Sequence, residues 1–243
     1  MSNNLLLKFG IELNNGVVGA SGGLGQAFVK KFVAQPNVAK IHAFSRTHIK
    51  FENEKVENHQ IDIQSEHSIQ EALDAIGDNI LFDIVVVATG FLHDEHISPE
   101  KTIRDVNMNH FREVFSVNTY GPALLAKYFL LRLQRDRKSN FACLSARVGS
   151  ISDNRLGGWF AYRASKAALN MILKNAAIEM ARRYKKACII GLHPDTVDTM
   201  ISKPFQRQVQ EGKLFTPEYS SVCLLKVINV VEPVQSGKVF AWD

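Results

Sequence analysis

The chain has 243 residues, 46% hydrophobic and 22% charged, which is the balance of an ordinary soluble globular protein. The net charge of +5 comes from scattered lysines and arginines whose clusters fall at expected helix ends, so we expect no nucleic-acid surface. No apolar stretch reaches the roughly 18 residues of a membrane span, and a secretion signal is not apparent. Three widely spaced cysteines predict free thiols in a reducing cytoplasm, and no Cys or His cluster has the spacing of a metal site.

The first recognisable unit is a short strand, a glycine-rich turn and a helix between residues 16 and 32. The turn follows Val17 and Val18 and consists of Gly19, Ala20, Ser21, Gly22, Gly23, Leu24 and Gly25. Glycines at this point let backbone N–H groups approach a pyrophosphate at the helix N-terminus. The spacing departs from the common dinucleotide fingerprint, so the turn alone equally fits a flexible glycine-rich loop.

The second strand indicates which dinucleotide is bound. Residues 38–44 form an apolar strand that ends in Ser45 and Arg46, the position that faces the adenosine ribose in such a unit. An acid there binds the 2′-hydroxyl of NAD(H), whereas an arginine accommodates a 2′-phosphate. Arg46 without a neighbouring carboxylate therefore favours NADP(H) over NAD(H), and an ordinary surface arginine is the competing interpretation.

Two further strands and two helices follow. Residues 56–63 read as a strand that ends in Asp62 and Ile63, and residues 68–76 as an amphipathic helix. Residues 81–87 are continuously apolar, as in a central parallel strand covered on both faces. This strand leads into the small residues Ala88, Thr89 and Gly90, at the strand end where ligands bind in open α/β sheets.

A long helix is expected over residues 107–134, with Pro122 either kinking it or lying one turn inside its second half. Asn118 is a polar residue within the apolar stripe of this helix. A satisfied buried hydrogen bond would explain a lone interior asparagine, and a catalytic role is the alternative.

Tyr162 and Lys166 lie four residues apart at the start of an Ala-rich helix that runs to Met180. Positions i and i+4 share a helix face, so the cation is expected to lower the pKa of the tyrosine and prepare it for general acid or base work. An isolated Tyr-x-x-x-Lys is more often a half-buried tyrosine beside a solvated lysine. The rest of the chain overturns that default.

Strands at residues 140–145, 187–192 and 237–242 and a helix from Pro217 complete the pattern. Residues 5–7 could begin another strand, but polar residues from 8 to 15 interrupt it. Six or seven strands that alternate with helices predict one doubly wound α/β domain over residues 1–243 with a mostly parallel sheet.

Taken in order, these motifs resemble the short-chain dehydrogenase/reductase family over roughly residues 16–242, in its C-factor and sniffer-type carbonyl reductase branch. The resemblance implies a Rossmann fold, with Tyr162 as general acid or base, Lys166 on the nicotinamide ribose, Asn118 in a water relay and a serine that polarises the carbonyl. It also implies NADP(H) binding by Gly19, Ser21, Gly22, Gly23, Leu24, Ser45, Arg46, Asp62, Ile63, Ala88, Thr89, Gly90, Tyr162, Lys166, Pro194, Thr196, Val197 and Thr199.

Three positions depart from the pattern that this family resemblance implies. Val18 stands where the family has a threonine, and Asp195 stands where a glycine is usual. The catalytic serine position holds Ala146, so Ser145 takes the role, or Ser150 if the Ser145 hydroxyl points into the sheet.

The expected function is NADP(H)-dependent hydride transfer between nicotinamide and a small carbonyl or alcohol substrate, in a cytoplasmic homodimer or homotetramer that contacts neither nucleic acid nor membrane. A catalytically silent dinucleotide-binding regulator is the main alternative. An extended-branch epimerase is disfavoured because little chain follows Thr199.

Overall fold

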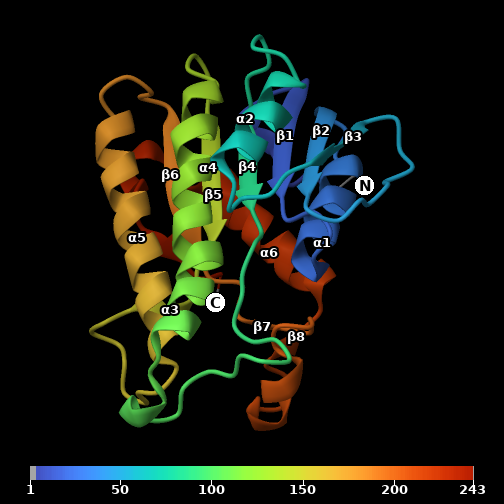
Figure 1. The fold of residues 1–243 in the computed structure, drawn as a ribbon. Helices are drawn as coiled ribbons and strands as arrows, with labels where there is room; N and C mark the ends of the chain where they lie inside the picture. The colour runs from blue at the N-terminus through green and yellow to red at the C-terminus, as the bar shows by residue number, and fades with distance from the viewer. Residues whose placement is uncertain (1–3, 243) are drawn as a thin grey trace.

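The structure, a computed structural model, describes residues 4–242 and contains a seven-stranded parallel sheet with helices on both faces (Figure 1). The strands are β1 (Leu13–Val18), β2 (Val38–Ser45), β3 (Val56–Gln60), β4 (Ile84–Val87), β5 (Ser139–Leu144), β6 (Ala187–Leu192) and β9 (Val239–Phe240). Their order across the sheet is β3-β2-β1-β4-β5-β6-β9. The chain thus winds from β1 outward to β3 and then from β4 outward to β9, which confirms the predicted doubly wound α/β fold.

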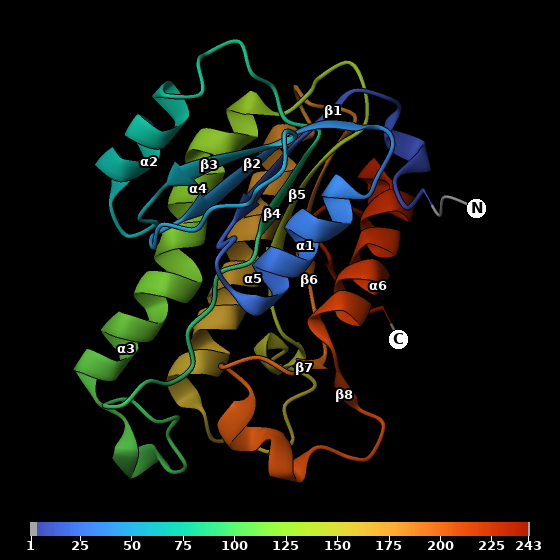
Figure 2. The same cartoon turned by 90° about the vertical axis from the view of Figure 1, so that its right-hand side faces the viewer.

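The helices form two layers, one on each face of the sheet (Figure 2). One layer consists of α1 (Gly23–Val33) and α6 (Pro217–Val230). The other consists of α2 (Glu66–Asp74), α4 (Gly121–Phe129) and α5 (Phe160–Met180), with α3 (Met108–Phe115) packed against α5.

Each layer encloses its own hydrophobic core. Phe28 and Phe32 of α1 pack on one face of the sheet, and Phe82 and Phe129 pack on the other. Each such side chain stabilises the fold by roughly 1.5–3 kcal/mol when fully buried. Every residue of β4 is buried, because helices cover both faces of this central strand.

The predicted helix over residues 107–134 is continuous but changes its winding in the middle. Between α3 and α4 the backbone forms a π-helical segment, Ser116–Tyr120, and a 3-10 turn, Leu130–Arg132, follows α4. Pro122 lies in the first turn of α4, where it lacks the N–H that would donate to the carbonyl of Asn118 four residues earlier. Asn118 lies within the π-helical segment, and such segments are frequent at functional sites.

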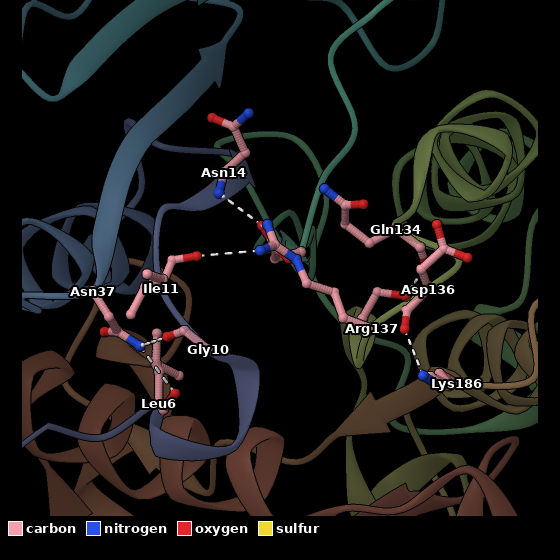
Figure 3. A network of polar contacts seen from close by, with 11 residues as sticks. Leu6, Gly10, Ile11, Asn14, Asn37, Gln134, Asp136, Arg137 and Lys186 are labelled. Carbon is pink, nitrogen blue, oxygen red and sulfur yellow. Dashed lines mark hydrogen bonds and ion pairs between the residues drawn. The ribbon is translucent and has the colours of Figure 1, made fainter.

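The N-terminal ends of the strands differ most from the sequence prediction. Residues 5–7 form no strand: a 3-10 turn spans Leu7–Phe9, and β1 begins at Leu13 in spite of its two asparagines. The backbone N–H of Asn14 donates to Oδ2 of buried Asp83, which also pairs with Arg137. Figure 3 shows Arg137 reaching across to the backbone carbonyl of Ile11. These contacts tie together the strand ends that lie opposite the site described next.

Other expectations hold with shorter boundaries. The strands predicted at 81–87 and 237–242 shorten to β4 and β9.

Cys143 and Cys188 are buried in β5 and β6, and the three cysteines are free thiols, as predicted. Within residues 4–242, no helix combines the length and the apolar character that crossing a membrane requires.

Candidate active site

The glycine-rich turn connects the carboxyl end of β1 to α1 in a shape that side chains would block. Gly19 has φ of 84°, in the left-handed region that favours glycine. A Cβ on Gly25 would lie 2.0 Å from the carbonyl oxygen of Gly19. The turn is fixed to the neighbouring strand because the N–H groups of Gly19 and Ala20 both donate to the carbonyl of Phe44 at 2.9 Å. The N-terminus of α1 is therefore open for a phosphate group.

An open pocket of about 250 Å³ lies over the carboxyl ends of β1, β2 and β4. It is lined by Val18, Gly19, Ser21, Gly22, Ser45, Arg46, Thr47, Ile61, Asp62, Ile63, Gln64, Ala88, Thr89, Gly90, Val117 and Ile201. This set contains most of the residues predicted for the cofactor, drawn from four separate segments of the chain.

Two groups at this pocket are available to a ligand. The Thr89 hydroxyl is buried and has no hydrogen-bond partner within the described part of the chain, so a ligand atom can satisfy it. Arg46 is exposed at the pocket and forms no ion pair among residues 4–242, which leaves its guanidinium available for an anion. Asp62 is the acid of the pocket, and its Oδ1 accepts a hydrogen bond from the backbone of Gln64 at 3.0 Å.

The remaining predicted cofactor residues lie beside the pocket rather than in its lining. Leu24 is buried in the core under α1, and Gly23 lies directly beneath Thr199, whose Cγ2 would be 2.9 Å from an added Cβ. The segment after β6 is fixed by a short pairing of β7 (Thr196–Val197) with β8 (Leu214–Phe215). Pro194 accepts hydrogen bonds through its carbonyl from Ser220 and Trp242.

Asp195 adopts a left-handed backbone conformation, which favours glycine. Its φ is 63°, and its Oδ1 accepts a hydrogen bond from the N–H of Thr196 at 3.0 Å. The local bond from the side chain allows aspartate to tolerate the left-handed conformation.

Tyr162 and Lys166 lie on one face of α5, with the Lys166 ammonium 5.7 Å from the centre of the tyrosine ring. Lys166 is 2% exposed, and its Nζ donates a hydrogen bond to the carbonyl of Leu144 at 2.8 Å. Burial lowers the pKa of Lys166 to about 8 and raises the pKa of Tyr162 to about 12. The prediction that Lys166 lowers the tyrosine pKa is therefore wrong: burial is the cause that acts on the Tyr162 pKa, and the Lys166 ammonium donates to Leu144 instead.

Asn118 links the Gly90 turn to the Tyr162 helix. Its side-chain amide is buried and exchanges two hydrogen bonds with the backbone of Phe91, at 2.8 and 2.7 Å. The same amide group donates to Oγ of Ser165 at 3.2 Å, and Ser165 donates to the carbonyl of Tyr162 at 2.8 Å. Asn118 is thus a satisfied buried asparagine that also sets the distance between the pocket and Tyr162.

The two candidate serines are in different environments. The hydroxyl of buried Ser145 donates to Oδ1 of Asn170 at 2.6 Å, two helical turns beyond Tyr162. Ser150 is partly exposed and follows Gly149, whose added Cβ would lie 2.9 Å from Cβ of Lys166. Ser150 therefore lies close to the Tyr162–Lys166 end of α5, whereas the Ser145 hydroxyl points towards Asn170.

An aromatic wall, defined as His93, Trp159 and Phe205, stands beside Tyr162. The ring centres of Trp159 and Tyr162 are 6.1 Å apart, those of Trp159 and Phe205 are 5.0 Å apart, and those of His93 and Phe205 are 5.6 Å apart. Three segments far apart in sequence thus meet around one apolar surface.

Sequence reasoning missed Glu100, which anchors the start of the Tyr162 helix. Its carbonyl accepts the N–H of Trp159 at 2.6 Å, and its carboxylate accepts the N–H of Ala161 at 3.2 Å. The carboxylate also lies 3.1 Å from Nδ1 of His110, and both side chains are buried. Glu100 lies in an irregular segment without periodicity, so only the long-range contact reveals it.

Comparisons with known proteins agree with this geometry. Residues 16–210 match the short chain dehydrogenase family. C-signal of Myxococcus xanthus is 31% identical over 139 residues, which cover 57% of this chain and 78% of that protein. The structure of carbonyl reductase from chicken fatty liver with NADPH bound matches with a TM-score of 0.82 at 22% identity, covering 97% of this chain and 94% of that chain. Carbonyl reductase Sniffer of D. melanogaster matches with a TM-score of 0.81 at 18% identity, covering 96% and 97%.

The two structural likenesses show a shared fold, and the similarity to C-signal agrees with the resemblance expected from the sequence. The family match spans most of the chain and includes the glycine-rich turn, the pocket and the Tyr162 helix. The chain therefore belongs to the short-chain dehydrogenase family of oxidoreductases.

Proposed function

We propose that this protein is an NADP(H)-dependent reductase that converts a carbonyl group into an alcohol, with Tyr162 as the proton donor. The observation that carries the proposal is that Asn118 connects the turn after Gly90, which lines the pocket, to the helix of Tyr162, whose ring centre lies 6.1 Å from that of Trp159 in the aromatic wall. Because its pKa is about 12, the Tyr162 hydroxyl keeps its proton at neutral pH, which suits an acid in the direction of reduction.

The site residues hold the substrate and move one proton. The nicotinamide cofactor supplies the hydride when it is bound. The Tyr162 hydroxyl donates its proton to the carbonyl oxygen as the carbonyl carbon gains the hydride, so the product is the alcohol and Tyr162 is left as the phenolate. Lys166 stabilises that phenolate, since it is the cation on the same helix face.

Asn118 and Lys166 return the proton to Tyr162. Lys166 can lose a proton near neutral pH because its pKa is about 8. The backbone carbonyl of Asn118 lies in the π-helical segment and cannot accept a hydrogen bond from Pro122, so we assign it as the acceptor for a water molecule. A water held there connects Lys166 to solvent.

We assign Ser150 rather than Ser145 as the hydroxyl that polarises the carbonyl. The Ser145 hydroxyl is occupied by Asn170 at 2.6 Å, whereas Ser150 follows the residue that packs against Lys166. Ala146 offers no hydroxyl.

Arg46 supports the choice of NADP(H) over NAD(H). It lines the pocket at the end of β2 and its charge is free to bind a 2′-phosphate. A carbonyl reductase of the same fold was solved with NADPH bound.

The aromatic wall supports a carbonyl substrate with an apolar or aromatic substituent. Flat rings at these separations offer edge and face contacts to another ring. A strongly charged substituent would lose its hydration against these rings without gaining a charged partner, so it is expected to bind weakly.

The test is a pair of tyrosine variants. Tyr162→Phe is expected to reduce NADPH-dependent turnover of aryl aldehydes and ketones by about 100- to 10,000-fold, since that is the usual contribution of general acid catalysis. NADPH binding, followed by nicotinamide fluorescence, should stay within about twofold of wild type, since the phenyl ring remains. Tyr120→Phe, at an exposed tyrosine of the π-helical segment, is the control. Retained turnover in Tyr162→Phe would refute the mechanism.

A silent dinucleotide-binding regulator is less well supported. Such a protein needs the pocket but has no need of Tyr162, Lys166 and Asn118 in one connected arrangement. It predicts tight NADPH binding with no turnover of any carbonyl in wild type as well as in Tyr162→Phe.

A further inference from the structure

Two histidines and a glutamate meet at the edge of the sheet, outside the cofactor pocket. His42 lies on β2, and Glu57 and His59 lie on the edge strand β3. His42 and Glu57 are direct partners in the strand pairing, and His59 is two residues further on, so all three side chains share one face. The fold thus joins residues whose spacing along the chain suggests no metal site.

Their ligand atoms are close enough to share one ion. Nδ1 of His42 is 3.0 Å from Nε2 of His59 and 3.4 Å from Oε2 of Glu57. Nε2 of His59 is 3.8 Å from the same carboxylate oxygen. In a tetrahedral zinc site with bonds of about 2.0–2.1 Å, neighbouring ligand atoms lie about 3.4 Å apart. The observed separations of 3.0, 3.4 and 3.8 Å lie around that value.

We propose that His42, Glu57 and His59 form a divalent-metal site that takes Zn²⁺. Two imidazole nitrogens and one carboxylate oxygen are a donor set that zinc accepts, with water in the fourth position. The Glu57 side chain is 44% exposed, so water and the ion can reach the site from solvent. His42 is 2% exposed and packs edge-on against the ring of Phe82, which fixes its orientation.

One charged neighbour contacts the site: Lys40 pairs with Glu57. Lys40 Nζ lies 2.7 Å from Oε1 and therefore competes with a metal for the charge of Glu57.

The consequence of binding is structural. The ion would join the edge strand β3 to β2, whose carboxyl ends lead to Asp62 and Arg46 in the pocket. None of the three ligands lines that pocket, so Zn²⁺ is expected to stabilise the fold without entering the reaction.

The test is calorimetric titration of chelator-treated protein with Zn²⁺, together with thermal melts. We expect one ion per chain and, at a hundredfold excess over Kd, a rise in Tm of roughly 5–10 °C. His59→Ala should weaken binding by more than about 100-fold, because loss of even an outer-shell partner costs about 10- to 100-fold. His67→Ala is the matched control, since His67 faces Glu71 at 3.2 Å on the exposed surface of α2.

A second variant separates a metal site from a plain histidine hydrogen bond. Lys40→Met removes the competing cation and leaves all three ligands in place, so Zn²⁺ should bind about tenfold more tightly. Co²⁺ bound to the same protein should show the visible absorption of a tetrahedral complex that is absent in His59→Ala. Wild-type protein that binds no Zn²⁺, or His59→Ala and His67→Ala variants that bind it equally, would overturn the proposal.

Discussion

Lys166, to which the proposed mechanism assigns a catalytic role, is expected to lower the stability of the folded protein, and Lys166→Met tests this directly. Burial lowers the lysine pKa from 10.5 to about 8. A tenfold change in proton affinity is worth about 1.4 kcal/mol, so the charged side chain costs the folded state about 3 kcal/mol at neutral pH. Methionine has similar length and no charge, but it loses the hydrogen bond to Leu144, worth about 1 kcal/mol. The variant should therefore gain about 2 kcal/mol and lose its turnover.

The pH dependence gives the sharper test. The folded pKa lies below the unfolded one, so Lys166 binds more protons in the unfolded chain between about pH 8 and 10.5, and its contribution to wild-type stability rises with pH there. Burial raises the pKa of Tyr162 and of Cys143 to about 12, which lowers stability at high pH in both proteins and so cancels in their difference. The free energy of unfolding of Lys166→Met exceeds that of wild type at pH 7, and this difference should shrink by about 2 kcal/mol between pH 7 and pH 10.

The measurement is urea unfolding of both proteins without nucleotide, followed by tryptophan fluorescence at several pH values. Lys174→Met, at an exposed lysine of the same helix, is the control and should show no such trend. A Lys166→Met variant that is less stable than wild type at every pH, by a constant amount, would refute the reasoning.

Three further outcomes are expected. Arg46→Ala should weaken NADPH binding by about 10- to 100-fold in a fluorescence titration and leave NADH binding almost unchanged. An equal loss of affinity for both cofactors would contradict the assignment of Arg46 to the 2′-phosphate. Ser150→Ala should lower kcat by about tenfold or more while Ser145→Ala lowers chiefly Tm, and the reverse pattern would restore Ser145. Glu100→Gln should lower kcat about tenfold with unchanged NADPH affinity, because it loosens the first turn of the Tyr162 helix; a matching loss of NADPH binding would show a general defect instead.

The fold was largely predictable because its signals are local. Continuous apolar strands, alternating helices and one glycine-rich turn suffice for a doubly wound sheet. The start of β1 was not predictable, because Asn14 and Asn15 are polar and disfavour a strand. Asn14 is held there by Asp83, a residue of the neighbouring segment 69 positions later. Tertiary hydrogen bonds thus override the local preference.

The site was predictable to the same extent. Residues that lie at a characteristic short spacing, such as Tyr162 and Lys166, could be identified from the sequence. The order of the turns that line the pocket could be identified as well. Glu100 was missed because it reaches Ala161 over 61 positions. The cluster of His42, Glu57 and His59 was missed for a related reason, since strand pairing rather than sequence spacing brings His42 to the other two.

The sign of a pKa shift, in contrast to the identity of a neighbour, depends on burial that spacing does not reveal. The i,i+4 relation correctly places a cation near Tyr162, yet the ammonium donates to the carbonyl of Leu144, with Lys166 buried and Tyr162 partly buried. Desolvation favours the neutral form of each, which raises the tyrosine pKa and lowers that of the lysine. A neutral phenol beside a lysine that can release its proton is a better arrangement for giving a proton to a carbonyl than a preformed phenolate would be. The burial that contradicts the simple electrostatic expectation therefore supports the proposed roles of Tyr162 and Lys166 in reduction.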